Sequence, residues 1–381
     1  MWLGFICKQK LMIFLISRIT LLHIDSCSFY VVGEALLVTA GLTTYFGDML
    51  RSTLVKIIHF LMPSELDVRY SIKRSEISTI IQGYLLGLLL FPLCFKFSVR
   101  IVGFFTNTRP CGARIQNESG RSILFFTLLA VSSATFIPQW VQVVNFVFSE
   151  PLKRLSLCIY WAAVICVSVH RFYNISKSSK VERILLRKYY HLMAVSMFVP
   201  ALVLQPKFLN LAFGAALAAF LVLEIIRVWR IWPLGEMIHH FMNAFTDHRD
   251  SDLLIVSHFS LLLGCALPIW ISSGFNDRPL APFAGILSLG IGDTMASMVG
   301  HKYGVLRWSK TGKKTIEGTA AGITSVMAAC SFLLPLLAST RYIQNWSSLL
   351  LAVIASGLLE AYTAQLDNAF IPLVFYSLLC L

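Results

Sequence analysis

Long apolar runs recur along the whole chain, and they constrain its fold more than any other feature of the sequence. A run of about 18 or more apolar residues can cross a bilayer as a helix, because a helix satisfies its own backbone hydrogen bonds. Hydrophobic residues make up 57% of the 381 residues and charged residues only 13%, whereas soluble domains carry about 25% charged residues. The sequence therefore predicts an all-α, polytopic transmembrane bundle with about 11 spans, in a range of roughly 10 to 13.

The predicted spans are separated by short loops, without a linker or an internal repeat. Their expected boundaries are 29–49, 77–97, 122–146, 152–170, 189–205, 208–228, 253–272, 282–299, 316–338, 349–364 and 370–381. We divide the chain into an N-terminal transmembrane region, residues 1–180, and a C-terminal transmembrane region, residues 181–381. The C-terminal region contains the loop region 290–318, which holds most of the candidate functional residues.

The net charge of +13 is carried by loops between apolar runs, and it forms no continuous basic patch with interleaved aromatic residues. This distribution argues against nucleic acid as a partner. Lys and Arg accumulate in the cytosolic loops of membrane proteins, which places the basic loops 171–188 and 302–314 in the cytosol. The same alternation places the glycosylation sequon at Asn345 on the opposite side. The basic residues at 51–74 do not follow it, so the topology of the N-terminal third stays open.

A face of small residues is predicted within the loop region 290–318, whose first part reads GIGDTMASMVGHKYG. Gly292, Ala296, Gly300 and Gly304 recur every fourth residue, so they lie on one side of a helix with 3.6 residues per turn. Such a face allows another backbone to approach closely. It predicts a packing seam between two helices.

A polar stripe, Asp293, Ser297 and His301, repeats with the same spacing beside the small residues. An ionisable residue near the end of a span is costly unless a partner or a ligand compensates its charge. Asp293 is therefore the first candidate functional residue of the chain.

Three lysines, Lys310, Lys313 and Lys314, follow the stripe and come shortly before Glu317. Phosphoryl transfer depends on cations that stabilise charge on phosphate oxygens, and this group suits that need. The run SKTGKKT lacks the first glycine and the preceding strand of a P-loop, and the protein-kinase motifs HRD and DFG are absent. Any nucleotide is therefore bound by another arrangement. A basic anchor at the membrane and a helical ion pair between Lys313 and Glu317 are the structural alternatives.

Two upstream segments carry polar residues in apolar surroundings. In RKYYHLM, the spacing puts Arg187, Lys188 and His191 on one helix face, either as a functional group or as an interfacial anchor. Glu224 lies deep in an apolar run, three residues before Arg227, and a structural ion pair between the two is the alternative to a functional role.

The C-terminal segment LLEAYTAQLDNAFIPL contains Glu360, Asp367 and Asn368. Two carboxylates interrupt an otherwise apolar tail here. Since acidic residues are rare within membrane segments unless they serve a function, we expect a functional role for this segment.

These segments together resemble a known family. GIGDTMAS followed by KTGKKTIEGT resembles the CTP-binding signature of the dolichol kinase family, and LLEAYTAQLDNAFIPL resembles the C-terminal end of its members. RKYYHLM and the segment around Glu224 resemble two further blocks of the family. The resemblance covers much of residues 187–381. The N-terminal region, residues 1–180, is similar to the family mainly at GEALLVTAGL, residues 33–42, and is expected to be shorter than in other members.

The resemblance implies a multi-pass enzyme of the endoplasmic reticulum membrane whose active loop faces the cytosol. Its implied reaction transfers the γ-phosphoryl group of CTP to dolichol or a related polyprenol, and the dolichyl phosphate formed serves protein glycosylation. The implied cofactor is Mg²⁺ or another divalent cation, with CTP as phosphoryl donor. The implied partners are the lipid alcohol, CTP and the bilayer, without nucleic acid.

The expected site residues form three groups under this interpretation. The catalytic group is Asp293, Lys313, Lys314 and His191. The nucleotide-binding group is Gly292, Ser297, Lys310, Gly312, Thr315, Glu317, Gly318, Arg187 and Lys188. The metal-binding group is Asp293 with Glu224 or Asp367, because Mg²⁺ usually takes one or two carboxylates and completes its shell with phosphate oxygens and water. The general base stays open.

Three other functions are compatible with parts of the pattern. Kinases of other lipid alcohols, such as phytol or diacylglycerol, share the GD and KxxEG elements according to the resemblance. A lipid-phosphate cytidylyltransferase would use a similar metal and similar lysines but release pyrophosphate. A membrane transporter predicts repeated halves with broken helices, and the sequence shows no such halves.

Overall fold

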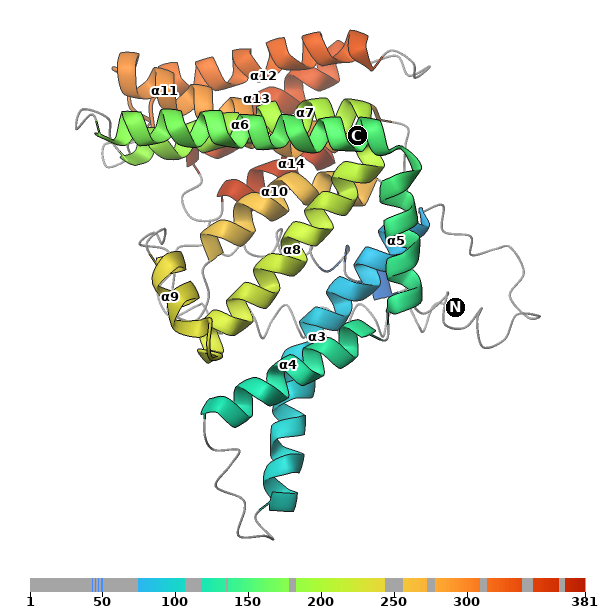
Figure 1. Ribbon diagram of the computed structural model, residues 1–381. Coiled ribbons are helices and arrows are strands. Elements are labelled where there is room, and N and C mark those ends of the chain that lie inside the picture. The colour runs from blue at the N-terminus through green and yellow to red at the C-terminus, as the bar shows by residue number, and fades with distance from the viewer. Residues whose placement is uncertain are drawn as a thin grey trace, which may run out of the picture. The chain divides into compact units, whose positions relative to one another are not determined.

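The computed structural model describes residues 43, 45, 47, 49–50, 75–106, 118–134, 136–177, 183–243, 256–272, 278–308, 314–337, 345–362 and 367–380. The described residues are overwhelmingly helical, which confirms the all-α prediction (Figure 1). The chain separates into two compact units. Unit 1 comprises residues 1–47, 152–209 and 260–381, and unit 2 comprises residues 48–151 and 210–259.

Unit 2 contains α3 (Glu76–Thr106), α4 (Glu118–Ala134), α5 (Ile137–Ser149), most of α8 (Pro206–Trp229) and α9 (Gly235–Asn243). Its core is aromatic: Phe91, Phe95 and Phe125 are buried together, and Trp229 stacks on Phe95 with ring centroids 4.7 Å apart. Because aromatic rings bury large apolar areas, this cluster holds α3, α4 and α8 against one another.

Unit 1 contains the helices that carry most of the candidate site. They are α6 (Pro151–Lys177), α7 (Arg183–Leu204), most of α10 (Val256–Ser272), α11 (Thr294–Tyr303), α12 (Ile316–Leu336), α13 (Trp346–Tyr362) and α14 (Asp367–Cys380). Two short elements precede α11, the 3₁₀-helix η3 (Ala281–Phe283) and the π-helix η4 (Ile286–Asp293). The π-helix packs against α7, α12 and α14, and α12 packs against both α11 and α13. Trp270, Leu287 and Phe375 are among the fully buried side chains of this unit.

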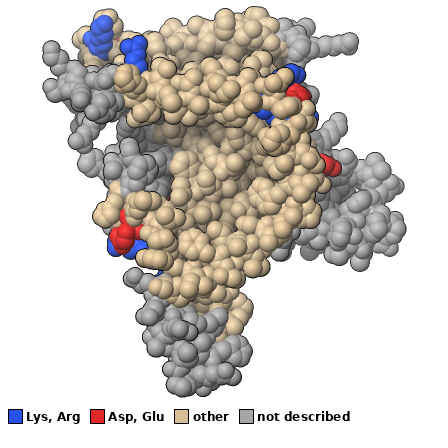
Figure 2. Space-filling view, viewed as in Figure 1, with Lys and Arg blue, Asp and Glu red and all other residues tan. Residues whose placement is uncertain are grey.

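Four described helical segments are long and apolar enough to cross a membrane, and a bent pair raises the number to five. The four are Glu76–Ile101, Pro151–Arg171, Pro206–Trp229 and Ile316–Leu336, close to four of the expected spans. Shorter apolar helices cover Lys188–Leu204, Phe259–Ser272, Trp346–Tyr362 and Asn368–Cys380. In the face shown in Figure 2, few of the described residues present charged side chains. A polytopic membrane protein is therefore supported, and the count of about 11 spans stays a prediction.

Two expected spans are not single straight helices. The expected span 122–146 forms α4 and α5, which are bent by 67° relative to each other, and Pro138 lies in the first turn of α5. Proline is tolerated in a first turn and disrupts a helix interior. The expected span 282–299 is divided into η3, η4 and α11. The expected span 29–49 lies almost wholly outside the described residues.

Two side chains of α6 donate hydrogen bonds to α7 next to a proline that interrupts the backbone hydrogen bonds of α7. Pro200 lies inside α7 and has no N–H, so it cannot donate to the carbonyl of Ser196 four residues earlier. The hydroxyl of Tyr160 on α6 donates to that carbonyl at 2.7 Å, and the indole of Trp161 donates to the carbonyl of Met197 at 2.9 Å. A backbone carbonyl without a partner is costly in hydrocarbon, so these two side chains stabilise α7 where its own ladder is interrupted.

Candidate functional site

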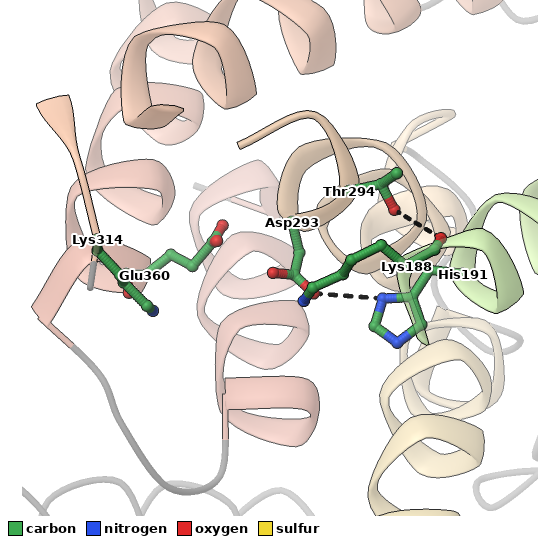
Figure 3. Close-up of polar contacts among 6 residues, drawn as sticks. All are labelled: Lys188, His191, Asp293, Thr294, Lys314 and Glu360. Atoms are coloured by element: carbon green, nitrogen blue, oxygen red, sulfur yellow. Dashed lines mark hydrogen bonds and ion pairs between the residues drawn. The ribbon is translucent and has the colours of Figure 1, made fainter. Parts of the chain in front are cut away.

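The site is built around the carboxylate of Asp293, which ends the π-helix η4 (Figure 3). Lys188 and His191 reach it from α7, where they are three residues apart and share one helix face. The ammonium of Lys188 donates to Oδ2 of Asp293, and Nδ1 of His191 lies 3.2 Å from the same oxygen. The three side chains are only 15%, 6% and 11% exposed for Lys188, His191 and Asp293 respectively. The structure thus joins three predicted site residues in one buried cluster.

The two carboxylate oxygens of Asp293 have different surroundings. A buried carboxylate is costly unless a cation compensates it, and Lys188 supplies that charge by direct contact. Both α7 side chains face Oδ2, and no described residue bonds Oδ1 of Asp293. The hydroxyl of Thr294 also donates to the backbone carbonyl of Lys188 at 3.4 Å, which ties the start of α11 to α7. One carboxylate oxygen is therefore bonded by Lys188 and lies close to His191, and no described residue bonds the other.

A π-helix is a rare element that often occurs at functional sites. Here Gly290 within it and Gly285 just before it permit close packing on both sides. A Cβ on Gly290 would collide with the side chain of Val195 on α7, and a Cβ on Gly285 would collide with the backbone of Gly264 on α10. These contacts bring the helix that ends at Asp293 within reach of α7.

The predicted face of small residues is confirmed as a packing seam between α11 and α12. A Cβ on Gly322 would lie 3.1 Å from the carbonyl oxygen of Gly292, and a Cβ on Gly318 would lie 2.5 Å from that of Ala296. A Cβ on Gly300 would lie 3.5 Å from the Cα of Gly318. At Gly318 only glycine permits this approach of two helix backbones, because the obstacle is backbone. The seam holds the helix that follows Asp293 against the start of α12.

The lysine loop is residues 309–313, and the residues on either side of it in the sequence pair with each other. Ile316 donates its N–H to the carbonyl of Leu306 at 2.8 Å, and Trp308 donates its N–H to the carbonyl of Lys314 at 3.2 Å. Arg307 and Thr315 form an antiparallel bridge between these bonds. We call residues 306–308 and 314–316 the loop stem. Residues 309–313 connect its two sides in the sequence, and Lys310, Gly312 and Lys313 among them lie outside the described residues.

Three predicted nucleotide-binding residues have structural contacts at this stem. Both carboxylate oxygens of Glu317 accept from the N–H of Leu306, at 3.0 and 3.2 Å. The hydroxyl of Thr315 accepts from the N–H of Gly318 at 3.2 Å and thereby caps the N-terminus of α12. These bonds position the stem, and the nucleotide-binding roles of the three residues stay predictions.

The stem is also attached to the end of α13. The ammonium of Lys314 donates to the backbone carbonyl of Glu360, in the last turn of α13, where helical carbonyls lack partners within the helix. The indole of Trp308 donates to the hydroxyl of Thr319 at 2.9 Å, and its ring lies 5.6 Å from that of Tyr362. These contacts hold the loop stem beside the end of α13.

Other predicted residues lie elsewhere or beyond the described side chains. Glu224 forms a buried pair with Arg227 in unit 2, with bonds of 2.7 and 2.8 Å, as the structural alternative anticipated. Ser297 is half-buried one turn after Asp293. Arg187 and Asp367 belong to α7 and α14, but their side chains are not described. The described residues contain no group of three or more His, Cys, Asp or Glu side chains suited to a metal.

Sequence reasoning identified the members of the cluster but not their association. The helical spacing of Lys188 and His191 was a usable signal, because it placed both side chains on one face. Asp293 lies 105 residues after Lys188, and no local pattern connects the two positions. The roles of Thr294 and Trp308 in holding the surrounding helices were missed, since neither belongs to a polar pattern.

Comparisons with known proteins identify relatives of this chain. A family model described as dolichol kinase matches residues 7–266. The chain is 68% identical over 365 residues to a dolichol kinase of Arabidopsis thaliana, covering 92% of this chain and 64% of that protein. It is 33% identical over 283 residues to the human dolichol kinase, covering 68% of this chain and 52% of that protein. A dolichol kinase of Bos taurus is 29% identical over 401 residues, covering 97% of this chain and 68% of that protein.

The chain thus spans 64% and 52% of the length of the plant and human relatives. No solved structure matches it. The family match extends into the N-terminal region, beyond the segments on which the sequence resemblance mainly rested, and includes α7 with Lys188 and His191. On these grounds the chain belongs to the dolichol kinase family.

Proposed function

We propose that this chain phosphorylates dolichol with CTP as the donor and forms dolichyl phosphate for protein glycosylation. The observation that carries the proposal is the buried cluster of Lys188, His191 and Asp293 in a member of the dolichol kinase family. A carboxylate with one oxygen bonded by Lys188 and close to His191, in the same unit as the stem of a lysine-bearing loop, suits the binding of phosphate groups with a divalent cation.

The proposed step is a direct transfer. The oxygen of the lipid hydroxyl bonds to the γ-phosphorus of CTP while the bond from that phosphorus to the β,γ-bridging oxygen breaks, and CDP leaves. The hydroxyl proton passes to a base in the cluster, for which Asp293 and His191 are the two candidates. Because the charge is spread over phosphate oxygens, catalysis rests mainly on positioning and electrostatics.

The lysines of the loop region are proposed to hold the CTP phosphates. Lys310 and Lys313 belong to the five residues between the two sides of the stem, while Lys314 and Glu317 connect the stem to α13 and to Leu306. Backbone N–H groups at Gly292, Gly312 and Gly318 would approach the same phosphates. In this proposal the stem sets the position of the loop, and the loop supplies the charge.

A divalent cation, Mg²⁺ in the first instance, fits the donors that the structure describes. Oδ1 of Asp293 is a hard oxygen ligand without a bond to any described residue. Mg²⁺ usually takes one or two carboxylates together with phosphate oxygens and water, so a large cluster of protein ligands is not required. When bound, the cation supplies positive charge against the phosphate oxygens. Asp293 is its proposed first ligand, and Asp367 remains a proposed second one.

We place the protein in the endoplasmic reticulum membrane, with the loop region 290–318 in the cytosol. The endoplasmic reticulum is what the family resemblance implies, and the orientation is supported by the concentration of Lys and Arg in the loops 171–188 and 302–314, which the positive-inside rule assigns to the cytosolic face. CTP is available on that side. The apolar helices of unit 1 give a long polyprenyl chain a lipid environment next to the site.

The test is phosphate transfer by membranes that contain the full chain. Radiolabelled γ-phosphate is supplied as CTP or ATP, with dolichol, phytol or diacylglycerol as acceptor. The expected result is dolichyl phosphate from CTP, with release of CDP. Transfer from ATP alone, preference for another alcohol, or release of pyrophosphate would contradict the proposed donor, acceptor or bond cleavage respectively.

Matched variants separate the site from general damage. Asp293→Asn and Lys313→Ala are expected to lose most of the transfer, whereas Glu236→Gln and Lys302→Met are expected to keep it. Glu236 is 60% exposed in unit 2, and Lys302 is an exposed residue of α11. Full activity of Asp293→Asn would remove the central residue from the proposed mechanism.

A further inference from the structure

Three exposed apolar side chains lie together at the loop stem. Val305, Leu306 and Ile316 are 81%, 60% and 41% exposed. Ile316 donates its N–H to the carbonyl of Leu306, so these two residues lie across the stem from each other, and Val305 precedes Leu306. Thr315, by contrast, is buried in the α11–α12 seam, where a Cβ on Gly304 would lie 2.6 Å from its Oγ1. We call Val305, Leu306 and Ile316 the stem patch. Large apolar side chains that are exposed together indicate contact with a membrane or with another protein.

The length of α12 sets the level of the stem patch relative to a bilayer. Ile316 is the first residue of α12, which runs for 21 residues to Leu336 and is long and apolar enough to cross a membrane. At about 1.5 Å per residue this helix extends ~31 Å, and the hydrocarbon core of a bilayer is ~30 Å thick. The helix has no turn to spare, so Ile316 lies at the edge of the hydrocarbon when α12 crosses. Leu306 is bonded to Ile316 and therefore lies at the same edge.

Exposed tyrosines lie near the stem patch, at the ends of two helices that pack against α12. Tyr303 ends α11 and Tyr362 ends α13, and both side chains are exposed. The ring of Tyr362 lies 5.6 Å from that of Trp308 in the stem. Tyr and Trp are enriched where membranes meet water, because their rings are apolar at one end and polar at the other. These side chains favour lipid headgroups over a protein partner as the surface that the stem patch contacts.

The charge beside the patch indicates which lipids are present there. Arg307 follows Leu306 and is exposed. It belongs to the basic loop 302–314, which the positive-inside rule assigns to the cytosolic face. The cytosolic leaflet carries anionic phospholipids, which attract basic side chains close to the membrane surface.

We propose that the stem patch inserts into the headgroup region of the cytosolic leaflet, with anionic phospholipid beside Arg307, and holds the loop stem at the membrane surface. The carboxylate of Glu317 accepts from the N–H of Leu306, so the first turn of α12 and the stem patch are joined. The consequence for the reaction rests on the proposed function. The apolar chain of a lipid alcohol stays in the hydrocarbon and its hydroxyl lies among the headgroups, so a stem at this level keeps the predicted phosphate-binding residues close to the acceptor.

Photo-crosslinking tests this contact without requiring transfer. The full chain, with p-benzoylphenylalanine in place of Leu306, is illuminated in vesicles of phosphatidylcholine and phosphatidylserine. Mass spectrometry of the peptide containing residue 306 is expected to show phospholipid adducts, enriched in phosphatidylserine. The same probe in place of Leu223, an exposed residue of the candidate span α8, is the matched control and captures lipid. The inference is overturned if position 306 gives no lipid adducts when position 223 does, or captures a second protein chain instead. Adducts in proportion to the vesicle composition would overturn the preference for anionic lipid.

Leu306→Gln tests the consequence for the reaction. We expect transfer to dolichol in vesicles to fall about tenfold, because a leucine side chain loses its apolar surroundings, whereas Leu306→Ile keeps most of the rate. Transfer to a short polyprenol dissolved in detergent should change little, and so should the KM for CTP. Since Leu306 is exposed in the chain, the unfolding temperature in detergent should match that of the wild type. An equal loss with both acceptors, or no loss with either, would contradict the role of the patch. Lipid adducts in a wild type that transfers no phosphate would overturn the proposed function alone, and transfer without adducts would overturn the lipid contact alone.

Discussion

Replacing Gly318 by alanine tests the packing seam that holds the site together. The added Cβ would lie 2.5 Å from the carbonyl oxygen of Ala296, about 0.9 Å short of the 3.4 Å at which ordinary contacts begin. The obstacle is backbone, so α11 and α12 must separate. Overpacking of this kind costs about 1–3 kcal/mol, and the better helix propensity of alanine offsets at most about 1 kcal/mol. We expect a net loss of about 1–2 kcal/mol in the free energy of unfolding.

Two other glycines provide a graded comparison in the same assay. A Cβ on Gly322 would lie 3.1 Å from the Gly292 carbonyl oxygen, a shortfall that a small shift relieves, so Gly322→Ala should be nearly neutral. A Cβ on Gly87 in α3 meets nothing within 4 Å, so Gly87→Ala should be neutral or stabilising. Unfolding of the purified proteins in one detergent should rank Gly87→Ala first and Gly318→Ala last. Equal stability of all three variants would refute the argument that the seam depends on close backbone contact.

Three further changes test individual contacts. Tyr160→Phe removes the hydroxyl that serves the α7 carbonyl left without a partner by proline, and we expect a loss of about 1 kcal/mol in unfolding free energy. Lys188→Met leaves Asp293 buried without its cation, so both the unfolding temperature and the rate of phosphate transfer should fall, the latter by at least about tenfold. Glu317→Gln weakens the hold on Leu306, so steady-state kinetics should show a higher KM for CTP with a smaller change in kcat.

Helical periodicity explains why the seam was predictable. Small residues at every fourth position form one face of a helix whatever the rest of the fold does, and Gly292, Ala296 and Gly300 do line the contact with α12. The partner face consists of Gly318 and Gly322, which are also four residues apart and follow the lysine loop in the sequence. The sequence indicated a seam, but only the packing of the two helices showed which glycines meet.

The prediction of a single span at 282–299 was inaccurate, and the reason lies in what hydropathy measures. Its apolar character predicts one membrane helix, yet the structure forms a 3₁₀-helix, a π-helix and α11 in succession. Hydropathy does not distinguish these helix types, because it averages over the segment. The close approach of Gly285 to α10 and of Gly290 to α7 accompanies the irregular geometry that ends at Asp293.

The sequence by itself predicted that this protein is helical and lies in a membrane. It also determined which charged and polar residue types its functional segments carry. The length of the apolar runs, the spacing of the small residues and the charges of the loop region 290–318 are all local properties of the sequence. The described structure agrees with a helical protein rich in apolar spans. Tertiary structure decided which charges meet. Lys188 and His191 reach Asp293 across about a hundred residues of chain. Such contacts depend on how several helices pack at once, which no period within one helix specifies.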